Sequence, residues 1–283
     1  MTIPGLRRGQ GWLRFGPRTF VMGIINMAPD SFAGDGLAGD AGAAEARALE
    51  MRAAGADLLD VGGRSTRPRA PAVEVGEELR RIIPALRRLA GIGVPLSVDT
   101  FSARVAAAAL DAGAAMVNDV SALREDPEMA PLLARAGVPV VLMDWNVRHA
   151  AVDVIADTLA FLRTRIAAAA AAGISEAQII VDPGYGFGLT VEQNMEMLRR
   201  LREMTALGRP ILIGTSRKGS IGSVLNLPVD DRLEGTMATV AVAIVHGADI
   251  VRAHDVRAIV RVARMTDAIV RGWPVQERED PPR

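Results

Sequence analysis

The sequence predicts an α/β fold built as a single closed (β/α)8 barrel, also called a TIM barrel. Three observations lead to this prediction. Short apolar segments recur along the chain, and a longer helical stretch follows each of them. These segments are apolar on both faces, as parallel strands covered by helices should be. Several helical stretches also end at a glycine just before the next apolar segment. An open doubly wound sheet alternates strands and helices too, so it is the main structural alternative.

The apolar segments give eight predicted strands. In chain order they are 20–25, 57–61, 95–98, 115–117, 138–143, 178–181, 210–213 and 249–251. Eight strand–helix repeats are the number that closes a TIM barrel, which favours the closed form over the open sheet.

Helical patterns lie between the predicted strands, at 41–54, 73–89, 102–112 and 191–206 among others. Each is long enough for the right-handed crossover that joins two parallel strands. The alanine-rich stretch 167–172 also fits a helix, because alanine has the highest helix propensity. Gly55, Gly113 and Gly247 follow three of the helical patterns, where a left-handed residue commonly ends a helix.

The composition fits one domain that acts on small molecules. A chain of 283 residues suits a single barrel domain over 1–283, with short termini that we expect to fray, such as the charged tail 276–283. Lys plus Arg number 33 and Asp plus Glu number 33, so no polynucleotide partner is expected. The absence of cysteine excludes disulfides and thiol chemistry. No signal peptide and no membrane span are recognisable, so we expect a cytoplasmic protein without a membrane partner.

Polar residues end nearly every predicted strand. They are Asn26, Asp60, Asp99 with Thr100, Asn118 with Asp119, Asp144, Asp182, Gly214 and its polar loop, and Arg252 with His254. In a (β/α) barrel these positions converge on one mouth, where active sites are built.

Helix capping is the structural alternative for each single aspartate. Asp99 and Thr100, followed by Ser102, fit a cap, and Asp119 fits a cap or a structural pair. Six or more polar groups at one mouth are harder to explain as caps. The set as a whole therefore indicates a binding site.

Two glycine-rich loops carry recognisable chemistry. After Gly62 and Gly63, the segment 65–68 is either a solvated loop or a lid whose Arg67 reaches an anion. The segment 182–188 is either a tight turn or a ligand loop, because its glycines let the backbone approach a ligand. There Asp182 can accept two N–H donors from an amidine-like heterocycle edge, and Phe187 supplies an apolar wall.

Cationic residues end the last two strands. The segment 214–220 lacks the spacing of a phosphate-binding P-loop, but its Lys218 can face a planar ring or an anion, or point to solvent. Arg252 and His254 are two residues apart, so a strand places both on the same face. Two such donors at the mouth suit a phosphate or a pyrophosphate. His149 and His246 lie in helical or loop contexts and are interpreted as structural or solvated.

Together these motifs resemble the dihydropteroate synthase family over roughly residues 20–260. The similar segments are GIINMAPDSF, DLLDVGGRSTRP, SVDT, VNDVSAL, IIVDPGYGFG, IGTSRKGSIG, RLEGTMATVAVA and VRAHDV. Their order along the chain makes the resemblance specific, although no single segment would.

The resemblance implies the reaction and the role of each site residue. Family members condense dihydropterin pyrophosphate with p-aminobenzoate, giving dihydropteroate and pyrophosphate, and are commonly homodimers.

The resemblance also implies the residue roles. The pterin edge would bind Asp99, Asn118 and Asp182, and Lys218 would lie near the ring. The pocket would be lined by Val120, Met143, Gly186 and Phe187. The pyrophosphate would bind Asn26, Arg252 and His254, with Asn26 also binding Mg²⁺. The p-aminobenzoate side would include Thr66, Arg67, Pro68 and Ser216. Lys218, Arg252, His254 and Asp35 would form the catalytic set.

The chain departs from the family pattern at four places. The acid in the loop after the first strand is moved by one residue, so that Gly34 precedes Asp35. Arg64 stands where the family has glutamate, Asp144 where it has histidine, and Gly219 where a serine often follows the lysine. The departures fall mostly in loops and on the acceptor side, whereas the pterin and pyrophosphate groups are retained.

Two other functions remain open at the level of sequence. A related pterin-binding barrel could transfer a methyl group from a reduced folate to a corrinoid protein, but it would not need Arg252 and His254 for pyrophosphate. A non-catalytic relative that binds a pterin or a partner would account for Gly34, Asp144 and Gly219.

Overall fold

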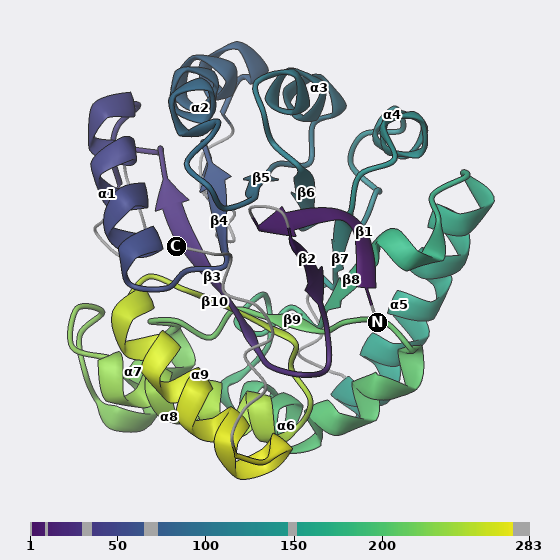
Figure 1. Ribbon diagram of the computed structural model, residues 1–283. Coiled ribbons are helices and arrows are strands. Elements are labelled where there is room, and N and C mark those ends of the chain that lie inside the picture. The colour runs from purple at the N-terminus through teal and green to yellow at the C-terminus, as the bar shows by residue number, and fades with distance from the viewer. Residues whose placement is uncertain (1, 9–10, 30–35, 65–72, 147–151, 274–283) are drawn as a thin grey trace.

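The computed structural model describes residues 2–8, 11–29, 36–64, 73–146 and 152–273. Eight parallel strands form one sheet in the order β8-β7-β6-β5-β4-β3-β10-β9. A parallel bridge between Val181 and Ile211 joins the two ends of that order, so the sheet closes on itself. Helices surround it on the outside, as Figure 1 shows. The predicted (β/α)8 barrel is therefore confirmed, and the open-sheet alternative is wrong.

All eight barrel strands overlap the predicted segments. They are β3 (Phe20–Asn26), β4 (Leu58–Gly62), β5 (Leu96–Asp99), β6 (Met116–Asp119), β7 (Val140–Met143), β8 (Ile179–Asp182), β9 (Leu212–Ile213) and β10 (Ile250–Ala253). Strands β3, β5 and β8 each extend one residue further than expected, into the polar residues Asn26, Asp99 and Asp182. Strand β9 is shorter than predicted, with two residues.

The helices follow the predicted crossovers. They are α1 (Ala41–Ala53), α2 (Val75–Leu89), α3 (Ala103–Asp111), α4 (Met129–Ala136), α5 (Val154–Ala171), α6 (Val191–Arg200), α7 (Gly219–Leu225), α8 (Leu233–Val245) and α9 (Val256–Arg271). Two short 3₁₀ segments are η1 (Glu176–Gln178) and η2 (Leu201–Leu207). The single helix predicted over 191–206 is thus an α-helix that tightens into a 3₁₀ helix, a common way for a helix to end.

An antiparallel hairpin of β1 (Thr2–Arg8) and β2 (Gly11–Arg14) precedes the barrel. It lies across the end of the barrel that faces the viewer in Figure 1, and β1 packs near η1. Just after it, Phe15 is buried and stacks edge-on against Phe20 with 5.1 Å between ring centroids. The expectation of a frayed N-terminus missed this hairpin, because a short Gly- and Arg-containing segment shows no clear strand pattern. The expected fraying of 276–283 concerns residues outside those described.

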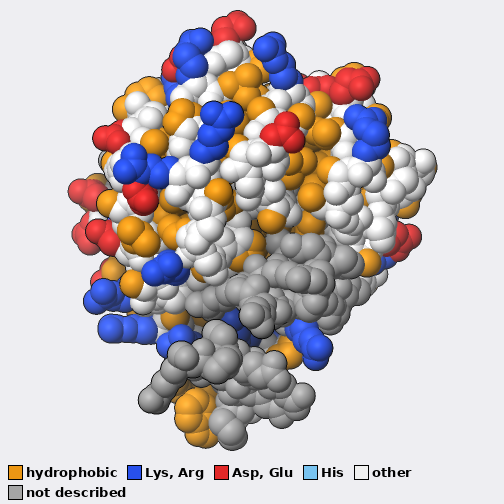
Figure 2. All heavy atoms as spheres, turned by 45° about the horizontal axis from the view of Figure 1, so that its top comes forward, with side chains coloured by type: hydrophobic (Ala, Val, Ile, Leu, Met, Phe, Trp, Pro, Cys, Tyr) orange, Lys and Arg blue, Asp and Glu red, His pale blue; other side chains and the backbone are white. Residues whose placement is uncertain are grey.

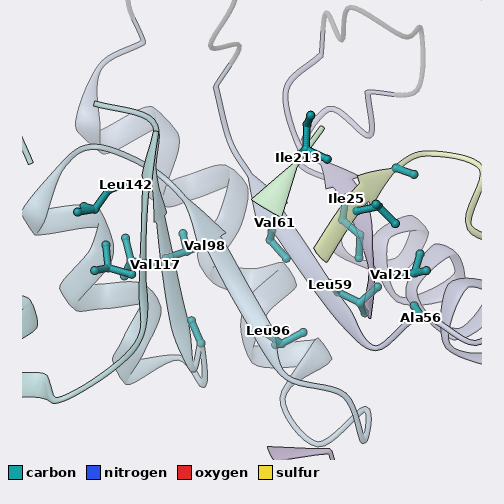
Figure 3. Packing of buried hydrophobic residues seen from close by; sticks show 14 of the residues in the cluster. Val21, Ile25, Ala56, Leu59, Val61, Leu96, Val98, Val117, Leu142 and Ile213 are labelled. Carbon is teal, nitrogen blue, oxygen red and sulfur yellow. The ribbon is translucent and has the colours of Figure 1, made fainter. Parts of the chain in front are cut away.

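Alternate residues of the strands build two separate apolar cores. Outward-facing residues pack against the helices, and Figure 3 labels ten members of this cluster, including Val21, Leu59 and Val98. Inward-facing residues fill the lower barrel, namely Phe15, Phe20, Met22, Leu58, Met116, Val141, Ile180, Leu212 and Ile250. This alternation follows from the two-residue period of a strand. The same alternation decides which polar residues at the strand ends point into the barrel interior.

The end of the barrel opposite the mouth is closed by long-range polar contacts. Arg18 pairs with Asp57 through two hydrogen bonds of 2.7 and 2.9 Å. Asp267 of α9 accepts hydrogen bonds from the Thr19 backbone at 2.7 Å and from the Thr19 hydroxyl at 2.9 Å. Arg271 donates to Asp267 and to the Gly16 carbonyl, both at 2.7 Å. The last helix is thereby fixed to the segment that begins the barrel.

No helix in the described ranges is long and apolar enough to cross a membrane. On the face shown in Figure 2, basic and acidic side chains are interspersed with apolar ones and are not segregated by sign. That distribution agrees with the balanced charge of the sequence.

Candidate active site

A layer of polar side chains lies directly above the apolar core of the barrel. Asp60 comes two residues after Leu58 and Asn118 two after Met116, so each points inward like its apolar predecessor. Asp182 and Arg252 stand in the same relation to Ile180 and Ile250. The carboxyl ends of β4, β6, β8 and β10 thus present a layer of polar side chains to the mouth.

Arg252 is the centre of this layer. Its Nε donates to Asp60 Oδ2 at 2.6 Å, and its Nη2 donates to Asp99 Oδ2 at 3.1 Å. Asn118 Nδ2 donates to the same oxygen of Asp60 at 2.9 Å. Asp60 is completely buried and Asp99 is 7% exposed, and the Oδ1 atom of each lacks a hydrogen bond within the described part of the chain. Two buried acids therefore share one guanidinium and retain further accepting capacity.

Lys218 lies along the loop that follows β8. Its ammonium is 3.8 Å from the centroid of the Phe187 ring, a cation–π contact. Its stem lies against Gly186, where an added Cβ would come within 2.7 Å of Lys218 Cδ. Gly186 also has φ +79°, which favours glycine. Glycine at this position thus lets the lysine cross the loop and reach the aromatic wall.

Asp182 is held at the base of the same loop. Its Oδ1 accepts the Gly184 N–H at 2.7 Å, and its side chain is 6% exposed. Gly184 has φ +75°, and an added Cβ there would clash with the Asp144 carbonyl oxygen. The predicted tight turn is present, and it fixes one oxygen of the acid.

His254 and Ser216 meet where the neighbouring strands β10 and β9 end. Ser216 Oγ is 2.9 Å from His254 Nδ1 and accepts the His254 backbone N–H at 3.2 Å. Both side chains are buried. The pair joins the loop after β9 to the residue after β10, and it orients the imidazole.

Burial perturbs the charges at the mouth. It raises the pKa of Asp182 to about 6, against the opposing effects of the Gly184 hydrogen bond and of Lys218. It also raises the pKa of Asp99, with repulsion from Asp60 adding to the effect and Arg252 opposing it. Burial lowers the pKa of Lys218 to about 8, and Arg252 contributes to this lowering. Perturbed groups of both signs gathered in one cluster are typical of a functional centre.

The remaining predicted site residues divide into three groups. Val120 and Met143 are buried in the upper barrel wall. Asn26 ends β3, is partly exposed, and accepts the Ala28 N–H through Oδ1 at 3.0 Å. Asp35, Thr66, Arg67 and Pro68 lie outside the described residues, as does His149.

Three of the departures from the family pattern can be located. Arg64 stacks on the Phe101 ring, with Cζ 3.9 Å from its centroid, and pairs with buried Glu78 at 3.4 Å. Asp144 is buried and accepts from Asn146 Nδ2 at 2.5 Å. Gly219 is exposed at the start of α7, and no atom lies within 4 Å of an added Cβ.

The structure corrects the capping interpretation of Asp99. Its carboxylate binds Arg252, while the first N–H of α3 donates to Asp126 at 2.7 Å. Thr100 instead donates to Glu78 at 2.8 Å. Asp119 behaves as the structural alternative expected, because it accepts from the Ser121 N–H and hydroxyl and from the Leu123 N–H.

Sequence reasoning missed the part played by Asp60. The sequence pattern marks it only as a strand end, whereas in the structure it contacts both Arg252 and Asn118. Its spacing of two from Leu58 was the available signal, since both must face the interior. The Tyr185 hydroxyl, 2.7 Å from Ser220 Oγ, was also missed, because nothing local in the sequence pairs the two loops.

A family model described as pterin binding enzyme matches residues 22–254. The chain belongs to the pterin-binding enzyme family. The matched part begins in β3 and ends at His254, so it contains the described mouth residues of this pterin-binding enzyme.

Individual relatives of this pterin-binding enzyme are dihydropteroate synthases. The one from Bacillus subtilis (strain 168) is 44% identical over 259 residues, which are 91% of each chain. A solved Xanthomonas albilineans dihydropteroate synthase with 4-aminobenzoic acid is 44% identical with a TM-score of 0.84, covering 89% of this chain and 93% of its own. The structure in complex with 7,8-dihydropteroate is 41% identical with a TM-score of 0.85, covering 95% and 98%.

Proposed function

We propose that this pterin-binding enzyme is a dihydropteroate synthase. It would condense 6-hydroxymethyl-7,8-dihydropterin pyrophosphate with p-aminobenzoate, giving 7,8-dihydropteroate and pyrophosphate. The observation that carries the proposal is the mouth itself, where buried acids that suit a pterin edge adjoin cations that suit a pyrophosphate. The solved relatives with 4-aminobenzoic acid and with 7,8-dihydropteroate support both the acceptor and the product.

The pterin half of the site would be formed by Asp99, Asn118 and Asp182. A pterin offers adjacent N–H donors along one edge, and a buried carboxylate accepts such a pair strongly. The acids have oxygens available, since Asp99 Oδ1 lacks a partner among the described residues. Phe187 would form a wall for the ring, and Lys218, already placed on that wall, would lie beside it.

The leaving pyrophosphate would face Arg252 and His254. Breaking the bond between the methylene carbon and the pyrophosphate oxygen gives a cation delocalised into the ring, so no protein nucleophile is needed. Two fixed donors at the departing oxygens stabilise the charge that develops there. When Nδ1 of His254 accepts from Ser216, its proton is on Nε2, the form that donates to an anion. The amine of p-aminobenzoate then forms the new C–N bond and loses a proton.

Mg²⁺ would be held by Asn26 together with substrate oxygens. No cluster of three or more His, Cys, Asp or Glu able to hold a metal occurs within the described ranges. Mg²⁺ often binds through one or two protein oxygens, waters and substrate phosphates, so a single amide oxygen at the mouth fits this mode. The Ala28 N–H holds that oxygen in place. When bound, the ion would neutralise charge on the pyrophosphate.

The deciding experiment measures pyrophosphate release from 6-hydroxymethyl-7,8-dihydropterin pyrophosphate with and without p-aminobenzoate. We expect p-aminobenzoate to accelerate release and to appear in 7,8-dihydropteroate. Methyl transfer from a reduced folate is the second candidate within the family, but it offers no pyrophosphate for Arg252 and His254. Binding of the pterin pyrophosphate without any acceleration would contradict the proposal and favour the non-catalytic alternative. A folate-pathway transferase of this kind would act in the cytoplasm.

We also propose that the protein is a homodimer that pairs through α6, α7 and α8. An apolar groove of about 500 Å³ lies between α6 and α8, lined by Val191, Glu192, Met195, Leu198, Arg199, Ala238, Thr239 and Val242. Nearby, Val224, Leu225 and Val245 are exposed. Exposed apolar residues beside an apolar groove are typical of a protein–protein contact.

Light scattering tests the proposed dimer. Val242→Glu should yield a monomer, because it buries a charge in the contact, whereas Ile269→Glu on the exposed face of α9 should not. A wild-type monomer at micromolar concentration would contradict the proposal.

A further inference from the structure

We propose that Asp60 is a positioning residue that holds the pterin half and the pyrophosphate half of the site in one fixed arrangement. The inference rests on the proposed function. Asp60 is completely buried, so it would act through Arg252 and Asn118 rather than through direct contact with a substrate.

The first step is the orientation of Arg252. A guanidinium is rigid and planar, so fixing two of its nitrogens fixes the direction of the third. Nε is held by Asp60 at 2.6 Å and Nη2 by Asp99 at 3.1 Å. Nη1 makes no hydrogen bond among the described residues, and the side chain is 22% exposed. Asp60 makes the shorter of the two bonds. It therefore contributes most to the direction in which Arg252 Nη1 can donate to an anion.

The second step is the orientation of Asn118. Its Nδ2 donates to Asp60 Oδ2, the oxygen that also accepts from Arg252. This bond restricts rotation of the amide, so it orients the Asn118 oxygen and its second hydrogen. One carboxylate oxygen thus anchors a residue of the proposed pterin edge and a residue of the proposed pyrophosphate site.

The third step is the fixed position of Asp60 itself. It lies on β4 between neighbouring strands β3 and β5, in register with Ile24 and Ser97. Leu58, two residues below it, packs in the lower apolar core of the barrel. Groups held by regular strands are placed more exactly than groups on loops. Asp60 can therefore serve as a rigid reference for the more exposed Arg252.

Binding of two separate probes tests the inference. Calorimetry would measure the affinity of 6-hydroxymethylpterin alone and of inorganic pyrophosphate with MgCl2 alone. Asp60→Asn keeps the shape but removes the charge, so Arg252 and Asn118 lose their strong acceptor. We expect both affinities to fall by about tenfold, the scale of one charge-assisted hydrogen bond. Asp182→Asn should weaken only the pterin probe, and Arg252→Lys should weaken the pyrophosphate probe more than the pterin.

A double-variant cycle separates positioning from a general loss of stability. In the Arg252→Lys background, Asp60→Asn should no longer reduce pyrophosphate affinity but should still reduce pterin affinity through Asn118.

In steady-state turnover, Asp60→Asn should raise the KM for the pterin pyrophosphate and leave the KM for p-aminobenzoate unchanged. Ser97→Ala is the matched control, because it removes a buried hydroxyl in register with Asp60 that has no described partner, and it should change neither affinity.

Two results would overturn the inference. One is wild-type affinity for both probes in Asp60→Asn; the other is reduced affinity of equal size in Ser97→Ala. Should Asp60→Asn not fold, Asp60→Ser leaves room for water at the carboxylate and is expected to lose affinity for both probes. A wild type that binds both probes without turning over would defeat the proposed function, while the affinities would still decide the role of Asp60.

Discussion

Asp182 combines a structural contact and an available acceptor in one side chain. The Gly184 N–H occupies Oδ1, and burial raises the pKa of the carboxyl to about 6, so the group is mostly ionised at neutral pH. Exchange for an amide keeps the size but can present a donor where the proposed ligand also has donors.

We therefore expect Asp182→Asn to lose most of its pterin affinity, about 1.5–3 kcal/mol for a charged hydrogen bond, while it still folds. Calorimetry with 6-hydroxymethylpterin measures the loss, and circular dichroism checks the fold. Normal pterin binding by this variant would contradict the assignment of Asp182 to the pterin edge.

Gly219 allows a direct test on the acceptor side. An added Cβ has no neighbour within 4 Å and the backbone is not left-handed, so serine fits without strain. We expect Gly219→Ser to lower the KM for p-aminobenzoate by about two- to tenfold, the range of one neutral hydrogen bond.

The control for Gly219→Ser is the KM for the pterin pyrophosphate, which should not change. Steady-state kinetics with each substrate varied in turn gives both constants. An unchanged KM for p-aminobenzoate would mean that the acceptor carboxylate is bound away from the start of α7.

At the scale of elements, the loops after β8 and β9 are joined by a buried hydrogen bond. The hydroxyl of Tyr185, a residue only 1% exposed, lies 2.7 Å from Ser220 Oγ in α7. In the same two segments, the stem of Lys218 lies against Gly186 and its ammonium lies over the Phe187 ring. The two loops therefore support the lysine together.

Tyr185→Phe should cost about 1–3 kcal/mol of stability, because Ser220 is left buried without its partner. It should also lower kcat/KM by misplacing Lys218.

Adding Ser220→Ala to Tyr185→Phe should restore part of the stability but not the kcat/KM. Thr19→Val, which removes a buried hydroxyl bond at the opposite end of the barrel, should cost stability alone. Equal kinetic losses in Tyr185→Phe and Thr19→Val would contradict a local role.

The sequence was sufficient for elements with strong local patterns. The apolar runs and their polar ends predicted all eight barrel strands. It was insufficient where partners are distant in sequence. The capping prediction for Asp99 was wrong because Arg252, 153 residues away, competes for its carboxylate. The bonds of Asp60 and Tyr185 were missed for the same reason, since no short motif encodes them.

At the scale of the whole molecule, buried charges at the mouth make stability depend on pH. Burial lowers the pKa of Lys218 from 10.5 to about 8. Below pH 8 the lysine is protonated in both the folded and the unfolded state. The folded protein then carries the full free-energy cost of burying that positive charge. Between pH 8 and 10.5 only the unfolded state keeps the proton, so the free energy of unfolding from this group rises with pH.

The wild type should therefore gain stability relative to Lys218→Met as the pH increases from about 8 to 10.5. Urea denaturation of both proteins at several pH values measures the difference. A difference that stays constant across this window would show that Lys218 has an ordinary pKa in the folded protein.

The contacts that fix α9 to the start of the barrel have a consequence for how the chain folds. Thr19 and Asp267 are 248 residues apart, and β3 also pairs with β10. Contacts of such sequence separation form slowly, because a long loop must close first. During synthesis, one edge of β3 therefore stays uncovered until β10 has left the ribosome. Exposed strand edges promote aggregation, so chains truncated before β10 should depend on chaperones far more than chains that contain β10 and α9.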